Sequence, residues 1–204
     1  MKYASFPQSA RVILAAAGIV SASILVSGGA LAQSCLNNTN PNLVKNGGFE
    51  LGSGTKIPDW TVEWNSKVDK YVRLDTTNPH SGAQDLELGT LDAPNDIVQV
   101  IDGTEGNTVY TVCFWLYSSP NVEAGVTTFD VLWNNVQVLE LTNSGQFGYQ
   151  YFALNVIAQG DDLDYLRFRE RNKEGFYYLD DVSVQLCTGC GLAPDGGRAN
   201  PKKE

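Results

Sequence analysis

The chain has 204 residues, of which 43% are hydrophobic and 10% aromatic, and its formal net charge is −9. An acidic chain without a basic run repels phosphate backbones and anionic membrane surfaces, so we expect no nucleic-acid partner. The aromatic content and the 20 glycines favour a domain built of strands and turns.

The first 32 residues have the pattern of a bacterial-type secretory signal peptide. Lys2 and Arg11 precede an apolar run from Val12 to Val26, and a small-residue A-x-A pattern ends at Ala32. Removal of this segment takes away two basic residues and no acidic one, which changes the formal net charge from −9 to −11. We therefore expect a secreted protein, extracellular or in the periplasm or cell envelope.

Two alternatives to cleavage remain open at this end of the chain. Val12 to Ala32 is just long enough to act as an uncleaved anchor across a bilayer. Lipidation at Cys35 is the other alternative, although a lipobox has a large aliphatic residue where this chain has Ala32. No membrane span is expected after the signal.

The remaining chain is expected to form one domain over residues 33–190, followed by a disordered Gly-, Pro- and charge-rich tail over residues 191–204. Short alternating or β-branched runs recur between Gly, Asn, Asp and Pro clusters, which predicts an all-β sandwich or barrel. The predicted strands are Asn42–Lys45, Thr61–Glu63, Tyr71–Leu74, Asp85–Leu88, Asp96–Ile101, Tyr110–Tyr117, Thr127–Trp133, Gln137–Leu141, Tyr149–Ile157, Tyr165–Arg171 and Phe176–Gln185.

Asn134-Asn135 separates two of these strands and predicts a tight hairpin, since Asn tolerates the positive φ of such a turn. Alternation along the strands also predicts which side chains face the core. Three strands would place their remaining large side chains on an outer face: Trp115 and Tyr117 on the first, Tyr149 and Tyr151 on the second, and Tyr165, Arg167, Arg169 and Arg171 on the third. If these strands share a sheet, the face combines aromatic rings and guanidinium groups.

The ends of the domain carry a family resemblance. Asn42-Leu43-Val44-Lys45-Asn46-Gly47-Gly48-Phe49-Glu50 opens it, and Tyr178-Leu179-Asp180-Asp181-Val182-Ser183-Val184 closes it, with Ile57-Pro58-Asp59-Trp60 and His80-Ser81-Gly82 between them. The order and spacing resemble the galactose-binding-like jelly rolls, in particular the family 4 and family 9 carbohydrate-binding modules and related exported bacterial sandwich proteins. The resemblance implies a jelly-roll β-sandwich over most of residues 42–185.

The resemblance also implies a structural calcium ion. In that family calcium commonly lies where the first strand region meets the last, which here would place Glu50 and Asp181 near it, with Asp180 as the neighbour. Carboxylates suit calcium, which takes six to eight oxygen ligands. The alternative is that Asp180 and Asp181 only end a strand and cap a turn.

Sugar recognition needs an exposed aromatic ring beside side chains that hydrogen-bond to hydroxyl groups. The predicted ligand-binding residues are Trp115, Tyr117, Tyr149, Tyr151, Arg167, Arg169 and Trp64. Trp60 is expected in the core, and the alternative for the other rings is that a loop or a second layer covers them.

The four cysteines allow three disulfide pairings in an exported chain. In a jelly roll of this type the first and last strands should be neighbours, so a Cys35–Cys187 disulfide, or its variant to Cys190, would tie the termini together. Cys187 and Cys190 could also be a redox or zinc pair, but no second ligand pair accompanies them. Cys113 lies within a predicted strand and has no assigned partner.

No enzyme motif is recognisable. The chain has a single histidine, His80, and lacks a nucleophile elbow, a zinc-protease motif and a phosphate loop. The acids at 161, 162, 164, 170 and 174 leave a glycosidase pair as the third hypothesis. The first is a secreted, non-catalytic domain that binds polysaccharide or cell-wall glycan, and the second is an envelope or matrix structural or adhesion protein that uses the sandwich for protein contacts.

Overall fold

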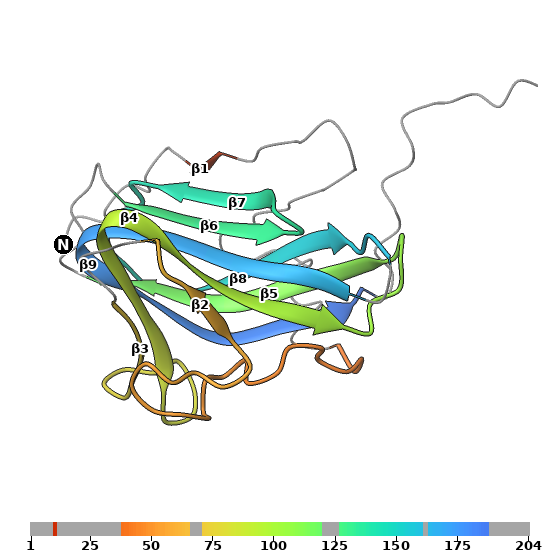
Figure 1. The fold of residues 1–204 in the computed structure, drawn as a ribbon, viewed down its shortest axis with the longest axis horizontal. Coiled ribbons are helices and arrows are strands. Elements are labelled where there is room, and N and C mark those ends of the chain that lie inside the picture. The colour runs from red at the N-terminus through yellow and green to blue at the C-terminus, as the bar shows by residue number, and fades with distance from the viewer. Residues whose placement is uncertain (1–9, 12–37, 66–70, 120–126, 161–162, 188–204) are drawn as a thin grey trace, which may run out of the picture.

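The structure, a computed structural model, describes residues 10–11, 38–65, 71–119, 127–160 and 163–187 (Figure 1). Most of the predicted signal peptide, Cys35, Cys190 and the predicted tail lie outside the described residues. Within the described ranges, no helix with the length and apolar character of a membrane span is present.

The described part of the chain is all-β and contains nine strands. They are β1 (Ala10–Arg11), β2 (Thr61–Glu63), β3 (Tyr71–Asp75), β4 (Asp85–Asp102), β5 (Val109–Ser118), β6 (Thr128–Trp133), β7 (Val136–Thr142), β8 (Phe147–Ile157) and β9 (Leu163–Leu186). All pairings are antiparallel, and they confirm the predicted jelly-roll β-sandwich.

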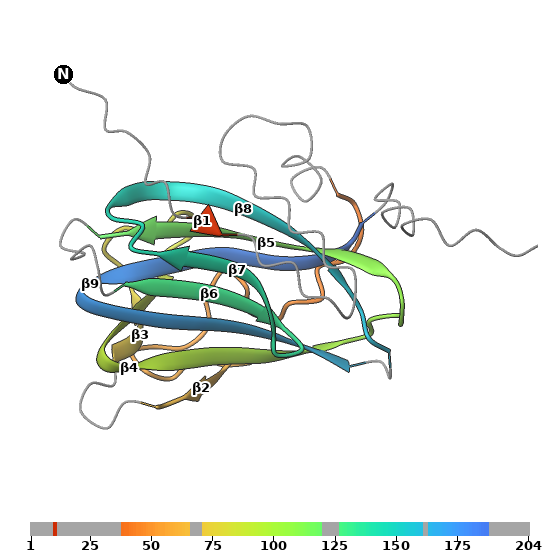
Figure 2. The ribbon, with the colours of Figure 1, turned by 90° about the horizontal axis from the view of Figure 1, so that it is seen from above.

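The strands form two packed layers, which Figures 1 and 2 show from two sides. We call the first layer the β6 sheet: it contains β2, the second half of β4, the first half of β9, then β6 and β7. The second layer, the β5 sheet, contains β3, the first half of β4, the second half of β9, then β5 and β8. β1 pairs with the edge of the first layer through β7.

Two long strands belong to both layers. β4 and β9 each join two segments that the sequence predicted as separate strands, and they stay paired through the bend at Thr90↔Asn172. The register shifts on both sides of this pair, between Leu88 and Thr90 and again between Thr90 and Asn95. Such irregularities bend a ladder without ending it, which is why the predicted breaks are bends.

The core lies between the layers and follows the predicted alternation. Phe114, Phe129 and Phe168 are fully buried and their rings contact one another, with centroid distances of 5.3 to 6.1 Å. Trp60 is buried, as predicted, and its indole Nε1 donates to the carbonyl oxygen of Asn46 at 3.1 Å. Burial of rings and branched side chains on both inner faces is the main stabilising contribution to this fold.

The predicted hairpin is confirmed, because Asn134 and Asn135 join β6 to β7 with φ of 50° and 63°. Residues 42–45, in contrast, do not form the predicted strand. The Asn42 carboxamide accepts hydrogen bonds from the backbone of Val44 and Val184, so a side chain replaces the ladder that a strand would need. This segment nevertheless lies along the end of β9, where the Leu43 amide donates to Val184 at 2.9 Å.

Cys113 and Cys187 are both disulfide-bonded, and no cysteine of the described residues is free. Cys113 therefore has a partner that its mid-strand position did not predict. Because Cys35 and Cys190 lie outside the described residues, the Cys35–Cys187 pairing stays a prediction.

Candidate functional site

The predicted binding face is divided between the two layers. Trp115 and Tyr117 on β5, with Tyr149 and Tyr151 on β8, lie in the β5 sheet, whereas the arginines lie in the first half of β9, in the β6 sheet. The expectation that they share one outer face is wrong, because β9 passes from one layer to the other between its two halves. The rings and the guanidinium groups consequently face away from each other.

A groove lies on the outer face of the β6 sheet and has a volume of about 450 Å³. Its apolar floor includes Val98 and Val100, and Tyr165 stands in it with 46% of its surface exposed. Its polar lining comes from Lys45, Asp59, Thr61, Glu63, Gln99, Asp102, Asn135 and Arg167. An exposed aromatic ring beside charged and amide side chains is the arrangement expected for sugar recognition, and here the ring is that of Tyr165.

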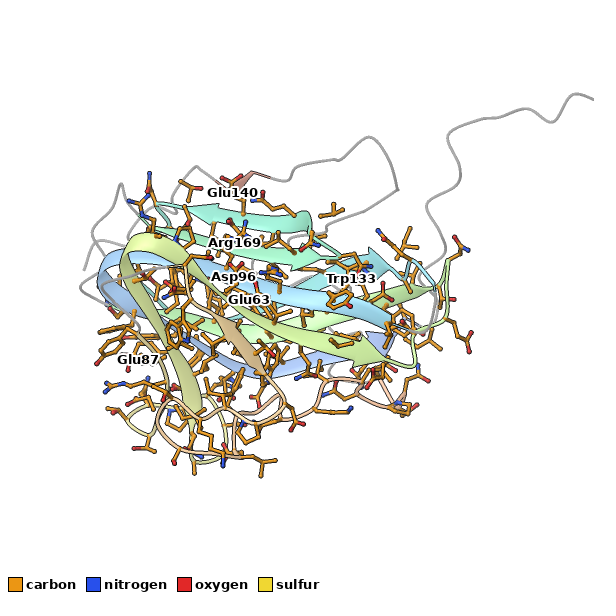
Figure 3. The ribbon with its side chains drawn as sticks, viewed as in Figure 1. Glu63, Glu87, Asp96, Trp133, Glu140 and Arg169 are labelled. Carbon is orange, nitrogen blue, oxygen red and sulfur yellow. The ribbon has the colours of Figure 1, made fainter. Side chains whose placement is uncertain are left out.

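The arginines are fixed in place by one buried carboxylate. Arg169 donates two parallel hydrogen bonds to Asp96, from Nε to Oδ1 at 2.8 Å and from Nη2 to Oδ2 at 3.0 Å. Arg167 donates to Asp96 as well and to Glu63 Oε2 at 2.5 Å. Figure 3 labels Glu63, Asp96 and Arg169, which lie close together on this layer. Because these ion pairs fix the guanidinium groups, the remaining N–H donors can bind a ligand with little further loss of side-chain conformational entropy.

The hairpin between β6 and β7 holds Tyr165 in position. The Asn134 amide donates to the Tyr165 carbonyl oxygen at 2.9 Å, and the Tyr165 amide donates to Asn134 Oδ1 at 2.8 Å. Gln99 builds the other wall, because its carboxamide accepts from the Lys45 amide and donates to the carbonyl oxygens of Lys45 and Asp59. Loops at both ends of the groove are thus tied to the sheet.

A further carboxylate on this face has a shifted pKa. Burial raises the pKa of Asp130 to about 6, the negative charge of Glu140 acts in the same direction, and Arg169 opposes both. Asp130 lies opposite Arg169 across the β6–β9 pairing. Its charge, and with it the charge of the face, changes near neutral pH.

Other predicted functional residues do not line the groove. Trp64 is partly buried and packs against the core. Asp164 and Glu170, two acids of the glycosidase hypothesis, are 0% and 1% exposed and cannot reach a polysaccharide. Asp161 and Asp162 lie outside the described residues.

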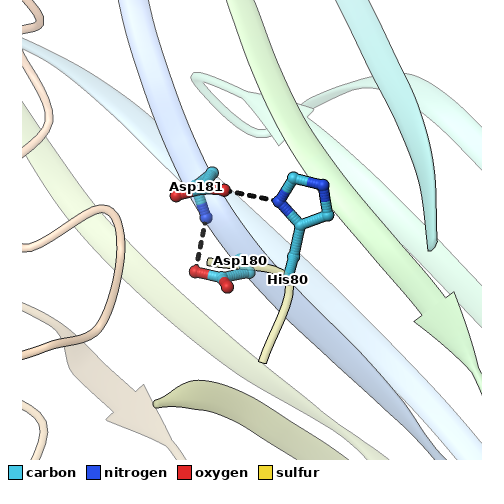
Figure 4. Close-up of side chains that lie close together, drawn as sticks. All are labelled: His80, Asp180 and Asp181. Atoms are coloured by element: carbon cyan, nitrogen blue, oxygen red, sulfur yellow. Dashed lines mark hydrogen bonds and ion pairs between the residues drawn. The ribbon is translucent and has the colours of Figure 1, made fainter. Parts of the chain in front are cut away.

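The acids of the predicted calcium site surround the loop at residues 80–84. Each of His80, Asp180 and Asp181 offers one ligand atom, and these three atoms lie within 4.8 Å of one another. Figure 4 draws the three side chains. The Nδ1 atom of His80 lies 2.6 Å from Oδ2 of Asp181, and the Ser81 amide donates to Asp180 at 3.0 Å. Burial raises the pKa of Asp180 to about 7.

Glu50 holds the other end of this loop. Its carboxylate accepts from the amides of Ala83 and Gln84 at 2.9 to 3.1 Å. Gly82 has a φ of +62°, a conformation that glycine adopts without strain, and a Cβ there would stand 2.2 Å from Glu50 Oε1, so a larger residue would displace the Glu50 carboxylate from the loop. We call Glu50, Asp180, Asp181 and the loop that they hold the latch.

Calcium fits this cluster in charge and ligand type, because three carboxylates converge on one loop. Five of the six carboxylate oxygens of the latch nevertheless accept a hydrogen bond from the protein. The sixth, Oδ2 of Asp181, lies within hydrogen-bonding distance of His80. The described geometry is that of a hydrogen-bonded latch, and an ion would have to replace some of these donors.

The comparison with known proteins identifies the fold. No known family matches the sequence, and no curated protein is similar to it. TmCBM61, solved in complex with β-1,4-galactotriose, is 21% identical with a TM-score of 0.53, covering 72% of this chain and 99% of its own. The tandem of family 22 carbohydrate-binding modules from Paenibacillus barcinonensis Xyn10C is 14% identical with a TM-score of 0.50, covering 79% of this chain and 49% of its own.

Part of an enzyme domain has a similar fold as well. The enzymatically active domain of tailspike protein 4 from bacteriophage CBA120 is 16% identical with a TM-score of 0.52, and the match covers 71% of this chain and 21% of the tailspike chain. The protein therefore has the jelly-roll β-sandwich fold of carbohydrate-binding modules, a fold that also occurs within a larger enzyme.

Tyr165, Lys45 and Asn135 were missed as site residues by the sequence argument. Tyr165 carried a usable signal, since alternation placed it on the same outer face as Arg167. Lys45 and Asn135 carried none, because their approach to the groove depends on how distant loops fold onto the sheet.

Proposed function

We propose that the protein is an exported, non-catalytic domain that binds polysaccharide in the groove of the β6 sheet. The observation that carries the proposal is the exposed Tyr165 ring beside the fixed guanidinium group of Arg167. The apolar face of a pyranose ring packs on an aromatic side chain, and its hydroxyl groups pair with charged and amide groups around it. The fold shared with TmCBM61, which was solved with a galactotriose, supports the same class of ligand.

Substitution Tyr165→Ala tests the proposal on a panel of soluble and insoluble polysaccharides. Loss of the ring is expected to weaken binding about tenfold, as about 1.4 kcal/mol of stacking would. Leu163→Ala is the matched control, because Leu163 is equally exposed on the same strand and does not line the groove. Equal affinity of both variants and the parent would refute the assignment of the groove.

The second candidate function predicts a different result from the same panel. An envelope or matrix protein that uses the sandwich for protein contacts would bind no glycan and would self-associate with a defined stoichiometry. Turnover of any glycan on the panel would instead revive the enzyme hypothesis.

Export is supported by the composition of residues 1–32 and by the bonded state of Cys113 and Cys187, since disulfides persist in oxidising compartments. N-terminal sequencing of the exported protein is expected to begin at Gln33.

Calcium in a structural role at Glu50, Asp180 and Asp181 is part of the same proposal, and the convergence of three carboxylates supports it. An ion bound only to the folded state raises the melting temperature. We expect calcium to raise the Tm and a chelator to reverse the change. A Tm that responds to neither would mean that hydrogen bonds alone hold the latch and that it binds no calcium.

A further inference from the structure

The outer face of the β5 sheet carries a continuous series of aromatic side chains, which we call the ring ladder. Its members are Tyr71, His80, Trp115, Tyr117, Tyr149, Tyr151, Phe176 and Tyr178, and each of them is partly exposed. They come from β3, β9, β5 and β8 and from the latch loop, so the ladder crosses the sheet from one edge strand to the other.

Successive rings of the ladder are in contact. On the β3 side, the centroids of Tyr71 and Phe176 are 4.8 Å apart, those of Phe176 and Tyr178 are 6.4 Å apart, and Tyr178 meets Tyr117 at 5.3 Å. Tyr117 then lies 5.6 Å from Tyr149. Spacings of this order are comparable to the length of one pyranose residue in a polysaccharide chain.

On the β8 side, His80 links two parts of the ladder. Its ring is 5.2 Å from Tyr149 and stacks on Trp115 at 3.9 Å with an interplanar angle of 17°. Trp115 in turn contacts Tyr151 at 5.3 Å. Since His80 covers one side of Trp115, the rings best placed to accept a ligand are those between β3 and β8, from Tyr71 to Tyr149.

Two buried carboxylates accept hydrogen bonds from tyrosines of the ladder. Asp85 and Glu87 are 0% and 3% exposed, and they accept hydrogen bonds from the hydroxyl groups of Tyr149 and Tyr178 at 2.7 and 3.2 Å. The Oδ1 atom of Asp85 has no hydrogen-bond partner among the described residues. The hydroxyl groups of Tyr149 and Tyr178 are therefore directed to buried acids.

The face already holds one cation of its own. The Arg73 guanidinium carbon lies 4.7 Å from the centroid of the Tyr71 ring, while its Nε donates to Glu87 at 2.5 Å. A cation over an aromatic face and beside a carboxylate is stabilised by both. Arg73 balances the charge of Glu87, which leaves Asp75 and Asp85 without an ion-pair partner among the described residues. These two acids lie opposite each other on β3 and β4, and although burial raises the pKa of Asp85 to about 6, it carries charge at neutral pH.

We propose that the ring ladder binds a polysaccharide that carries protonated amino groups, such as a chain of glucosamine residues. The pyranose rings would lie on Tyr71, Tyr178 and Tyr117, and their ammonium groups would balance the negative charge of Asp75 and Asp85. A neutral glycan satisfies the rings but leaves the acids without a counter-charge, which is why charge selects between the two.

The ladder is independent of the groove. The two lie on the outer faces of opposite layers, with the whole core between them. One molecule can hold a glycan chain on each face, so the protein would join chains to one another as well as bind them. This second consequence rests on the proposed function of the groove; binding of amino sugar by the ladder does not.

The test compares a glucosamine oligomer with its fully N-acetylated counterpart, at a pH where the free amine is protonated and at two salt concentrations. The parent protein is expected to bind the amine form about tenfold more tightly, with affinity falling as salt rises. Tyr117→Leu, which keeps apolar bulk and removes the ring, should weaken binding of the amine form about tenfold. Asp85→Asn, which removes charge at nearly constant shape, should abolish the preference for the amine form.

Three controls make the outcome decisive. Tyr165→Ala changes the groove and must leave amine binding intact, and Leu163→Ala changes neither face. The melting temperature of each variant shows that the fold is retained. Absent binding of the amine form, equal affinity for both oligomers, or loss of binding in Tyr165→Ala but not in Tyr117→Leu would overturn the ladder proposal. The groove proposal is decided separately, by binding of neutral polysaccharides to the parent and to Tyr165→Ala.

Discussion

At the scale of the residue, the interior holds an unusual acid. Glu170 lies opposite Asn95 and Phe129 and is 1% exposed. Among the described residues, neither of its carboxylate oxygens has a hydrogen-bond partner, and the same is true of the side-chain amide of Asn172. Burial raises the pKa of Glu170 well above its ordinary value, and the negative charge of Asp96 adds to the shift.

This shift makes stability depend on pH in a defined direction. Above about pH 4.3 the unfolded chain releases the Glu170 proton while the folded protein keeps it, so stability falls as pH rises, by up to about 1.4 kcal/mol per pH unit, until the folded pKa is reached. Glu170→Gln keeps the shape without the titration. We expect its stability relative to the parent to increase between pH 5 and pH 8 in urea denaturation.

The control for this experiment is Glu105→Gln, which changes an exposed carboxylate. Its stability should follow the parent at every pH within about 0.5 kcal/mol. A constant difference between Glu170→Gln and the parent across the pH range would show that Glu170 is ionised in the folded protein.

At the scale of the element, the segment at residues 42–50 packs so closely on β9 that one added methyl group should lower the stability of the protein. The Val182 amide donates to the Gly47 carbonyl oxygen at 2.9 Å, and a Cβ on Gly47 would stand 2.0 Å from the Val182 carbonyl oxygen. Gly47→Ala must therefore move backbone and is expected to destabilise the protein by about 1–3 kcal/mol.

Gly148 provides the matched comparison, since a Cβ there meets nothing within 4 Å. Gly148→Ala should change the unfolding free energy by less than about 0.5 kcal/mol. Thermal or urea unfolding of the two variants measures the difference, and equal destabilisation would mean that the segment at residues 42–50 does not dock on β9 in solution.

Elements also show how far the sequence predicts the structure. Alternation predicted the inward side chains of β5 and β8 because each strand stays in one layer. It predicted the first half of β9 equally well, with Leu166 and Phe168 buried. Alternation specifies a side of a strand but not the layer that contains it, so the separation of the arginines from Trp115 depended on the bend in β9. The groove could not be predicted either, since its walls come from loops.

At the scale of the whole molecule, disulfides bear on how the ends are held. Cys187 follows β9, and its amide donates to the Val109 carbonyl oxygen at 3.0 Å. A bridge from Cys35 to Cys187 would close a loop of about 150 residues and contribute roughly 4–5 kcal/mol by restricting the unfolded chain. Peptide mapping without reduction is expected to recover Cys35 linked to Cys187; recovery of Cys35 linked to Cys113 would contradict this pairing.

Because β9 passes through both layers, it also limits where insertions and deletions are tolerated during evolution. Phe168 in its first half and Leu179 in its second both point to the core, which fixes the number of residues between them. Deleting one residue at the bend would turn Leu179 outward and send Asp180 inward. The turn at Asn134 and Asn135 has no such constraint, because both of its strands end there. Insertions and deletions should therefore accumulate in the turns of this lineage and be rare at the bend.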